Sequence, residues 1–248
     1  MALVQLQWFS QTLGMHMVTW ALLPNNAKPP YATLYLLHGR SDDGSIWTRR
    51  TRLELHAEKY PLAIVMPTAL RGFYTHNDKA PDFAKYIAED VVQSSERFLP
   101  LKADRKARAI GGLSMGGYGA LRVGLARPDL FSSIHSHSGA LLGCSEGSKL
   151  EGTPEGEWIF GTKRFAGSQH DLLVHAKAAK KAGHLPKIKI DCGTEDFLIE
   201  VNRKVHGQLQ RAGIPHEYDE YPGTHNWDYW DTHIQTALAF HAKNLRLH

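Results

Sequence analysis

Residues 109–121, AIGGLSMGGYGAL, join an apolar run to a helical segment through one short turn, which is typical of an α/β fold. Residues 112–116 read Gly-Leu-Ser-Met-Gly and fit the G-x-S-x-G pattern of a nucleophile elbow. A serine on that turn has strained backbone angles, and Gly112 and Gly116 remove the side chains that would clash with it. On these residues alone, an ordinary tight turn is the alternative. The segment predicts that Ser114 is a nucleophile held at the end of a buried strand.

The rest of the chain alternates between strand-like and helix-like segments, which predicts an α/β fold. Continuous apolar runs are typical of strands buried on both faces, and apolar residues three or four apart are typical of helices packed against a sheet. The order implies a mostly parallel sheet with helices on both faces, with an antiparallel pair leading in, and ligands bound where the strands end. The expected strands are residues 3–9, 15–23, 32–39, 61–67, 107–114, 131–139, 187–193 and 216–223, and the expected helices are residues 83–98, 115–128, 171–183, 198–212 and 230–245.

Composition and charge narrow the class of protein. The 248 residues are 42% hydrophobic and 22% charged, as in ordinary soluble globular proteins. The net charge is +4, but the densest basic stretch, residues 177–181, lies on one helix, so we expect no nucleic-acid partner. Two cysteines are too few for a disulfide scaffold, and the opening MALVQLQWFSQTLG lacks the features of a signal peptide. No run reaches the roughly 18 apolar residues of a membrane span, so we expect a cytoplasmic protein with no membrane partner.

A serine nucleophile needs a base and a carboxylate that orients the base, and in this type of fold the chain order is serine, acid, histidine. The segment KIKIDCGTEDFLI carries three acids near a strand end. Asp191 falls inside the strand and Glu195 is expected to point away, which favours Asp196 as the acid; a helix N-cap is its alternative role. Among 15 histidines, His225 follows the last expected strand and precedes the final helix. We therefore expect His225 to be the base.

An ester or amide substrate also needs donors for the negative charge that develops on its carbonyl oxygen. The backbone N–H of the residue after the nucleophile, Met115, supplies one donor, and Arg40 in the loop HGRSDDGS supplies the other. The pair His135-x-His137 places two imidazoles on one strand face, but no third metal ligand stands at a recognised spacing, which favours a structural role. Nucleotide-binding signatures are missing from the sequence, and we expect neither a cofactor nor a metal.

With these residues assembled, the chain resembles the putative-esterase (esterase D-like) family of α/β-hydrolases, and within it the tributyrin-esterase-type carboxylesterases. The similar blocks are FSQTLGMHMVTWALLP, YLLHGRSDDGSIWTRRT, GGLSMGGYGALRVGLARPDLFSS, CGTEDFLIEVNR and YPGTHNWDYW. The resemblance implies an α/β-hydrolase fold with Ser114 as nucleophile, Asp196 as acid and His225 as base, and with oxyanion donors at Arg40 and Met115. Arg40 departs from the apolar residue of many relatives, and RSDDGS lacks the cysteine that formylglutathione hydrolases usually carry near this loop.

The expected organisation is a single α/β-hydrolase domain over residues 1–248, with residues 140–168 as a cap over the site. Trp158 and Phe160 in this insertion are candidates to line the substrate pocket, and packing beneath a long loop is their alternative role. The expected activity is that of a serine carboxylesterase on short-chain acyl esters, acetyl to butyryl, including acetylated sugars or aryl esters. Feruloyl esterase, S-formylglutathione hydrolase and acyl transfer to an acceptor other than water are the alternatives. A non-catalytic binding domain is disfavoured because no triad residue is missing. The sequence leaves open whether the protein forms a homo-oligomer.

Overall fold

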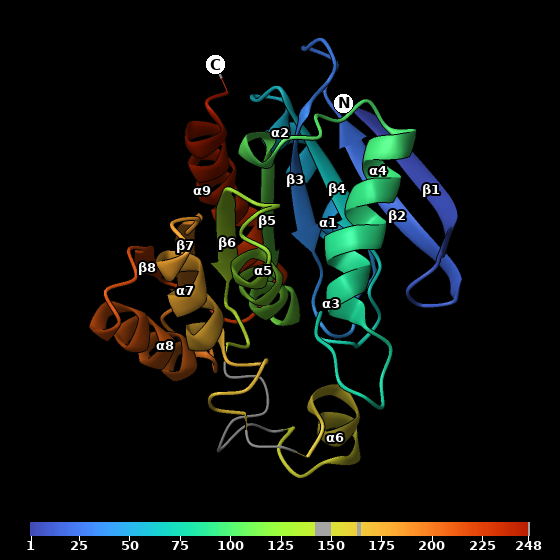
Figure 1. Cartoon of the computed structure of the whole chain (residues 1–248). Helices are drawn as coiled ribbons and strands as arrows, with labels where there is room; N and C mark the ends of the chain where they lie inside the picture. The colour runs from blue at the N-terminus through green and yellow to red at the C-terminus, as the bar shows by residue number, and fades with distance from the viewer. Residues whose placement is uncertain (142–149, 163–164, 248) are drawn as a thin grey trace.

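The computed structural model describes residues 1–141, 150–162 and 165–247, and these residues build one eight-stranded sheet. Its strands are β1 (Ala2–Ser10), β2 (Met15–Leu23), β3 (Ala32–Leu37), β4 (Leu62–Pro67), β5 (Arg108–Leu113), β6 (Ser133–His137), β7 (Lys187–Gly193) and β8 (Glu217–Tyr221). Their order in the sheet is β1-β2-β4-β3-β5-β6-β7-β8 (Figure 1). β2 pairs antiparallel with both β1 and β4, and all the other neighbours are parallel. The predicted mostly parallel sheet with an antiparallel lead-in is therefore confirmed.

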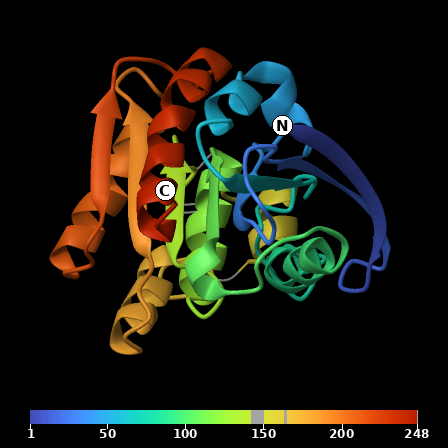
Figure 2. The ribbon, with the colours of Figure 1, turned by 90° about the horizontal axis from the view of Figure 1, so that it is seen from above.

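Helices cover both faces of the sheet, as Figure 2 shows from above. Along β3, Leu34 and Leu36 belong to the apolar cluster on one face, whereas Tyr35 and Leu37 belong to the cluster on the other. Because both faces are dry, β3 reads as an unbroken apolar run. One face carries α1 (Ile46–Arg50), α2 (Leu53–Ala57) and α9 (Trp227–Leu245); the other carries α3 (Phe83–Lys85), the π-helix η1 (Tyr86–Val91), α4 (Val92–Phe98), α5 (Met115–Ala126), α7 (Leu172–Lys181) and α8 (Ile199–Arg211).

Two segments differ from the prediction in their local structure. The helices α1 and α2 have five residues each, which is too short for a helical period to show in the sequence. The single helix expected at residues 83–98 is interrupted by the π-helical stretch η1 between α3 and α4. Wider π turns are often found at functional sites.

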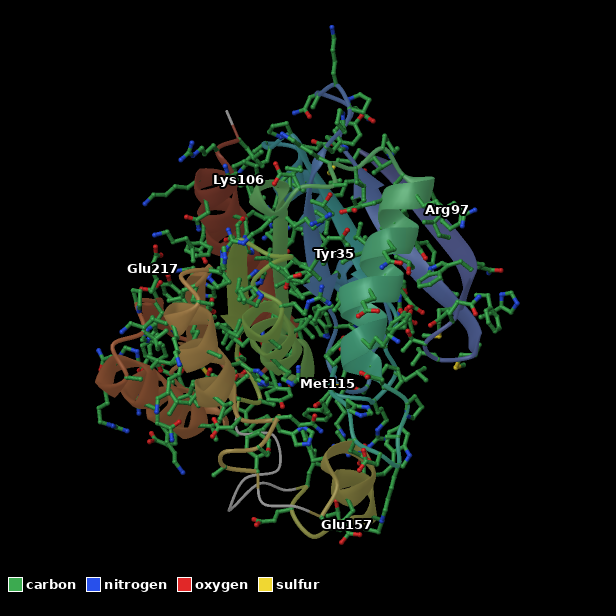
Figure 3. All side chains as sticks on the ribbon, in the orientation of Figure 1. Tyr35, Arg97, Lys106, Met115, Glu157 and Glu217 are labelled. Atoms are coloured by element: carbon green, nitrogen blue, oxygen red, sulfur yellow. The ribbon has the colours of Figure 1, made fainter. Side chains whose placement is uncertain are left out.

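The carboxyl ends of the parallel strands lie at one end of the molecule. Figure 3 shows Met115, the first residue of α5, at this lower end, and Lys106, which precedes β5, at the opposite end. Beyond the lower end lies α6 (Pro154–Phe160), part of the expected cap at residues 140–168 (Figure 1). Its N-terminus is capped by the Thr153 hydroxyl, which accepts a hydrogen bond from the N–H of Gly156. Residues 142–149, with Cys144, and residues 163–164 of the expected cap lie outside the described residues.

Candidate active site

Ser114 occupies a strained turn between β5 and α5. Its backbone angles are φ 51° and ψ −116°, which residues other than glycine rarely adopt. The N–H of Ser114 donates to the carbonyl of His137 at 2.9 Å, and the carbonyl of Ser114 accepts from the N–H of Ala140 at 3.0 Å. The end of the neighbouring strand β6 therefore holds the strained turn in place.

The glycines on either side of the turn are required by close backbone contacts. A Cβ atom at Gly116 would lie 2.5 Å from the carbonyl oxygen of Leu37 and 2.7 Å from that of His38. A Cβ atom at Gly112 would lie 2.7 Å from the backbone of Gly116. The start of α5 thus packs directly against the end of β3, which brings the loop after β3 next to Ser114.

The side chains of Ser114, His225 and Asp196 form a continuous hydrogen-bonded chain. Nε2 of His225 lies 3.0 Å from Oγ of Ser114, and Nδ1 of His225 lies 2.8 Å from Oδ2 of Asp196. When Nδ1–H donates to the carboxylate, Nε2 is left as the acceptor for the serine hydroxyl proton. The structure therefore brings together the three side chains that the sequence singled out.

Asp196 is held as a carboxylate although it is only 2% exposed. Burial by itself would raise its pKa, but hydrogen bonding and charge from His225 and the N–H of Leu198 outweigh burial and lower the pKa below 3.8. The Leu198 N–H donates to Oδ1 at 2.8 Å, so each carboxylate oxygen has its own partner. The hydroxyl of Ser138 also helps to lower the pKa of this carboxylate, and it accepts a hydrogen bond from Nε1 of Trp230 at 3.3 Å.

Ser138 was missed by the sequence reasoning. It follows β6 and has a positive φ of 46°, and its N–H donates to the carbonyl of Asp191 at 2.8 Å. A serine after a strand has no distinctive pattern in the sequence, and only the fold places it beside Asp196.

The loop after β3 is supported from below by a buried neutral histidine. Nε2 of His38 accepts a hydrogen bond from the N–H of Ala69 at 2.9 Å, and Nδ1 lies 2.7 Å from the carbonyl of Gly39, so Nδ1 carries the proton. Burial lowers the pKa of His38 to about 4, which keeps the ring neutral at pH 7. The hydroxyl of Tyr74 donates to the carbonyl of His38 at 3.0 Å, and these bonds fix the path of the loop.

The backbone N–H groups of Arg40 and Met115 lie at the two positions expected for oxyanion donors, after β3 and at the start of α5. Among the described residues, neither N–H donates a hydrogen bond to another protein group.

A carboxylate joins the loop after β3 to the expected cap. Glu155 on α6 accepts hydrogen bonds from Nε and a terminal nitrogen of Arg40, and it accepts two more from Arg71, both at 2.8 Å. The hydrogen bonds and charges of Arg40 and Arg71 outweigh burial and lower the pKa of Glu155. This double ion pair fixes α6 against the loop that carries the amide of Arg40.

Ser114 opens into a cleft of about 640 Å³. The cleft contains side chains that the sequence reasoning missed, above all Phe197, Trp227 and Trp230. The rings of Phe197 and Trp230 lie 4.6 and 4.9 Å from the His225 imidazole, centroid to centroid. Their only sequence signal is position, since Phe197 follows Asp196 directly and the tryptophans follow His225 by two and five residues. The lining residues are Gly39, Arg40, Ser41, Asp42, Arg71, Leu113, Ser114, Phe197, His225, Asn226, Trp227 and Trp230.

The pocket residues expected in the cap need correction. Phe160 is 3% exposed and packs in an aromatic cluster, with ring centroids 5.3 Å from Phe73 and 6.1 Å from Tyr118. Trp158 is 40% exposed, and its carbonyl accepts a hydrogen bond from the Asn77 side chain. Neither residue is part of the cleft lining around Ser114. Phe160 therefore has the alternative role, packing beneath the long loop, because its ring lies in the core between α5 and α6.

The other acids near β7 have structural partners. Asp191 is fully buried, and its two oxygens lie 2.7 Å from Nδ1 of His137 and 2.9 Å from the hydroxyl of Tyr229. Glu195 points to the neighbouring loop, where it accepts a hydrogen bond from the N–H of Gly223 at 2.6 Å. The expected assignment of Asp196 rather than Asp191 or Glu195 to the histidine is consistent with these contacts.

His135 and His137 are both fully buried beneath α9. Nδ1 of His135 lies 2.7 Å from Nε2 of His241, and burial lowers the pKa of His135 well below 6.5 and that of His241 to about 3. Three or more histidine, cysteine or acidic side chains placed to hold a metal ion do not occur in the part of the chain that the structure describes. Over the same residues, every helix is too short or too polar to cross a membrane.

Residues 10–241 match the protein family described as "Putative esterase". The chain belongs to this esterase family. An acetyl esterase of Caldicellulosiruptor saccharolyticus is 30% identical over 98% of this chain and 99% of its own length. Two Staphylococcus aureus structures are also similar at 29% identity, each over 97% of this chain and 98% of that chain. They are a substrate-bound fluorophosphonate-binding serine hydrolase, with a TM-score of 0.87, and an S-formylglutathione hydrolase, with a TM-score of 0.84. The α/β-hydrolase fold expected from the sequence is confirmed.

Proposed function

We propose that this esterase-family protein is a serine carboxylesterase that hydrolyses short-chain acyl esters, acetyl to butyryl, through an acyl-enzyme. The observation that carries the proposal is the hydrogen-bonded chain from Asp196 through His225 to Ser114 at the mouth of an open cleft. A nucleophile, its base and an orienting carboxylate in this geometry are what acyl transfer requires.

In the acylation step, Oγ of Ser114 attacks the carbonyl carbon of the ester while its proton passes to Nε2 of His225. The tetrahedral intermediate collapses, the bond to the alcohol oxygen breaks, and His225 returns the proton to the leaving alcohol. In deacylation, His225 takes a proton from water, the resulting hydroxide attacks the acyl carbon, and Ser114 leaves with that proton. Asp196 holds the imidazole in the required tautomer and stabilises its cationic form in both steps.

Negative charge on the carbonyl oxygen is stabilised by the backbone N–H groups of Arg40 and Met115, which have no partner within the described protein. Each such donor contributes on the order of 10²–10³ in rate. The double ion pair between Glu155 and the arginines Arg40 and Arg71 supports this role, because it holds the Arg40 loop in place before the substrate arrives.

The substrate range is proposed from the cleft and from the relatives. The similar protein named acetyl esterase supports a small acyl group. The aromatic rings of Phe197, Trp227 and Trp230 offer apolar surface for an aryl alcohol or a sugar ring. The similar structure named S-formylglutathione hydrolase keeps thioester hydrolysis as the second candidate.

A panel of substrates tests the proposal: p-nitrophenyl acetate, butyrate and octanoate, an acetylated xyloside, methyl ferulate and S-formylglutathione. We expect kcat/KM to be highest for acetyl and butyryl esters and roughly tenfold or more lower for octanoyl. A maximum with methyl ferulate or S-formylglutathione would replace the proposed substrate class. If none of these compounds is hydrolysed, a non-catalytic binding domain is the remaining interpretation. The assay is repeated with added xylose or an added alcohol. Formation of the acylated acceptor in place of the free acid would show acyl transfer.

A further inference from the structure

A second cavity, separate from the Ser114 cleft, is lined by residues of α5, α3 and η1 and of the loops beside them. Figure 1 shows α3 next to α5. Its volume is about 240 Å³, and it shares no lining residue with the Ser114 cleft. A space of this size holds several waters or one small molecule, since a water molecule has about 30 Å³ of liquid volume. The lining residues are His76, Asp82, Ala84, Lys85, Ala88, Glu89, Arg122, Val123, Ala126, Arg127 and Gln169.

A buried cation at this cavity has no partner among the described residues. Arg122 on α5 is 7% exposed, its Nε atom is buried without a hydrogen bond, and its guanidinium makes no ion pair with any described residue. The contrast is Arg108, which is 8% exposed and makes two parallel hydrogen bonds to the carboxylate of Glu96. Buried charges in proteins are paired as a rule, because an isolated one is costly to remove from water.

The acids that share the cavity are bound elsewhere. Oδ1 of Asp82 caps α3 by accepting from the N–H of Lys85, and Oδ2 lies 3.4 Å from Nδ1 of His76. Glu89 lies 3.6 Å from a terminal nitrogen of Arg127. Arg122 therefore makes no ion pair with the acids of this lining, although the charge of Asp82 acts on it, and Lys85 and Arg127 are further cations in the lining.

The histidines behind the cavity are consistent with that charge. Burial and the nearby charge of Arg122 together lower the pKa of His170 to about 4. Burial and the same charge lower the pKa of His175. The charge of Asp171 raises the pKa of His175, but burial and the charge of Arg122 outweigh it.

Short apolar side chains complete the cavity. Ala84, Ala88 and Ala126 line the cavity together with Arg122, and Ala88 lies in η1. A buried guanidinium beside short apolar side chains suits a small anion, whose oxygens accept the parallel N–H bonds of the fork.

We propose that this cavity binds a small oxyanion, a short-chain carboxylate or a phosphate, through Arg122. The site does not depend on the proposed esterase activity. The alanines next to the guanidinium suit the alkyl part of a carboxylate, and Lys85 suits the second charge of a phosphate. The test uses one ligand of each kind and so distinguishes a carboxylate from a phosphate.

The test measures binding to the purified full chain by calorimetry and by the midpoint of thermal unfolding, Tm. The ligands are sodium propionate and sodium phosphate, with sodium chloride at matched ionic strength as reference. Arg122→Met removes the charge, and Arg122→Lys keeps it but loses the fork. Arg97→Met, an exposed arginine on α4, is the matched control.

We expect saturable binding of one of the two ligands and a Tm rise of roughly 5 °C above the chloride reference at a hundredfold excess over Kd. The control behaves like the wild type, Arg122→Lys binds at least about tenfold more weakly, and Arg122→Met shows no specific rise. If only propionate saturates the wild type, the natural ligand is a carboxylate; if only phosphate does, it is a phosphate. Absence of saturable heat with both ligands in the wild type overturns the proposal, whatever the variants do. So does an undiminished Tm rise in Arg122→Met or Arg122→Lys.

Discussion

The ring of Phe197 lies 4.6 Å from the His225 imidazole, centroid to centroid, while 66% of Phe197 is exposed at the cleft. A large exposed aromatic beside the proposed base offers apolar surface that a bound acyl or alcohol group covers, at about 25 cal/mol per Å². Phe197→Ala should therefore raise KM for p-nitrophenyl butyrate roughly tenfold, equal to about 1.4 kcal/mol, with a much smaller change in kcat. Phe9→Ala, an exposed phenylalanine on the edge strand β1, is the control. A fall in kcat at constant KM would assign Phe197 to holding His225 instead.

Asp196 is proposed to orient His225 without exchanging protons with it. Asp196→Asn should keep the fold and lower kcat by on the order of 10⁴, because the amide favours the wrong tautomer of the imidazole. Glu200→Gln, which changes an exposed carboxylate on α8, should leave kcat unchanged. Steady-state kinetics with p-nitrophenyl acetate measure both variants. Near wild-type kcat in Asp196→Asn would remove Asp196 from the mechanism.

The buried histidines predict an acid limb in the stability of the protein. Burial lowers the pKa of both His38 and His170 from 6.5 to about 4, so the unfolded chain takes up protons first as the pH falls. The stabilisation from each neutral ring is complete above pH 6.5 and is lost progressively between pH 6.5 and pH 4, by up to about 1.4 kcal/mol per pH unit. Urea unfolding between pH 5 and 7 measures the slope. His38→Asn should be less stable at pH 7 but have a shallower slope; an unchanged slope would contradict the neutral state of His38.

Two glycines in helices should respond oppositely to alanine. At Gly116, the added Cβ would meet backbone oxygens at 2.5 and 2.7 Å, which cannot move without displacing β3. Gly116→Ala should therefore cost about 3 kcal/mol or more and greatly reduce esterase activity. At Gly207 in α8, the nearest atom is the flexible end of Arg211 at 3.3 Å, so Gly207→Ala should stabilise by up to about 1 kcal/mol. Thermal unfolding measures the stability of the two variants. Equal changes in stability would show that the backbone around Gly116 can move to accept a Cβ atom.

The strands and the chain Ser114–His225–Asp196 could be predicted because their signals are local. β3 and β5 are buried on both faces, and each of the three side chains follows its own strand in a fixed order. The other features of the site depend on contacts between segments that are distant in the sequence, which no local pattern reveals. Nothing near Glu155 indicates that it meets Arg40 and Arg71, which are 115 and 84 residues away in the chain. The expected pocket role of Phe160 was wrong because the aromatic partners that bury it come from other elements.

Covalent trapping of the nucleophile tests directly whether Ser114 is the residue that attacks the ester. The protein is incubated with a fluorophosphonate, which phosphonylates an activated serine, and is then analysed by intact mass and peptide mapping. We expect one adduct per chain, located on Ser114, with loss of p-nitrophenyl acetate hydrolysis in proportion to labelling. We expect neither labelling nor hydrolysis in Ser114→Ala. An adduct on another residue that accounts for the lost activity, or hydrolysis by Ser114→Ala at the wild-type rate, would contradict this role of Ser114.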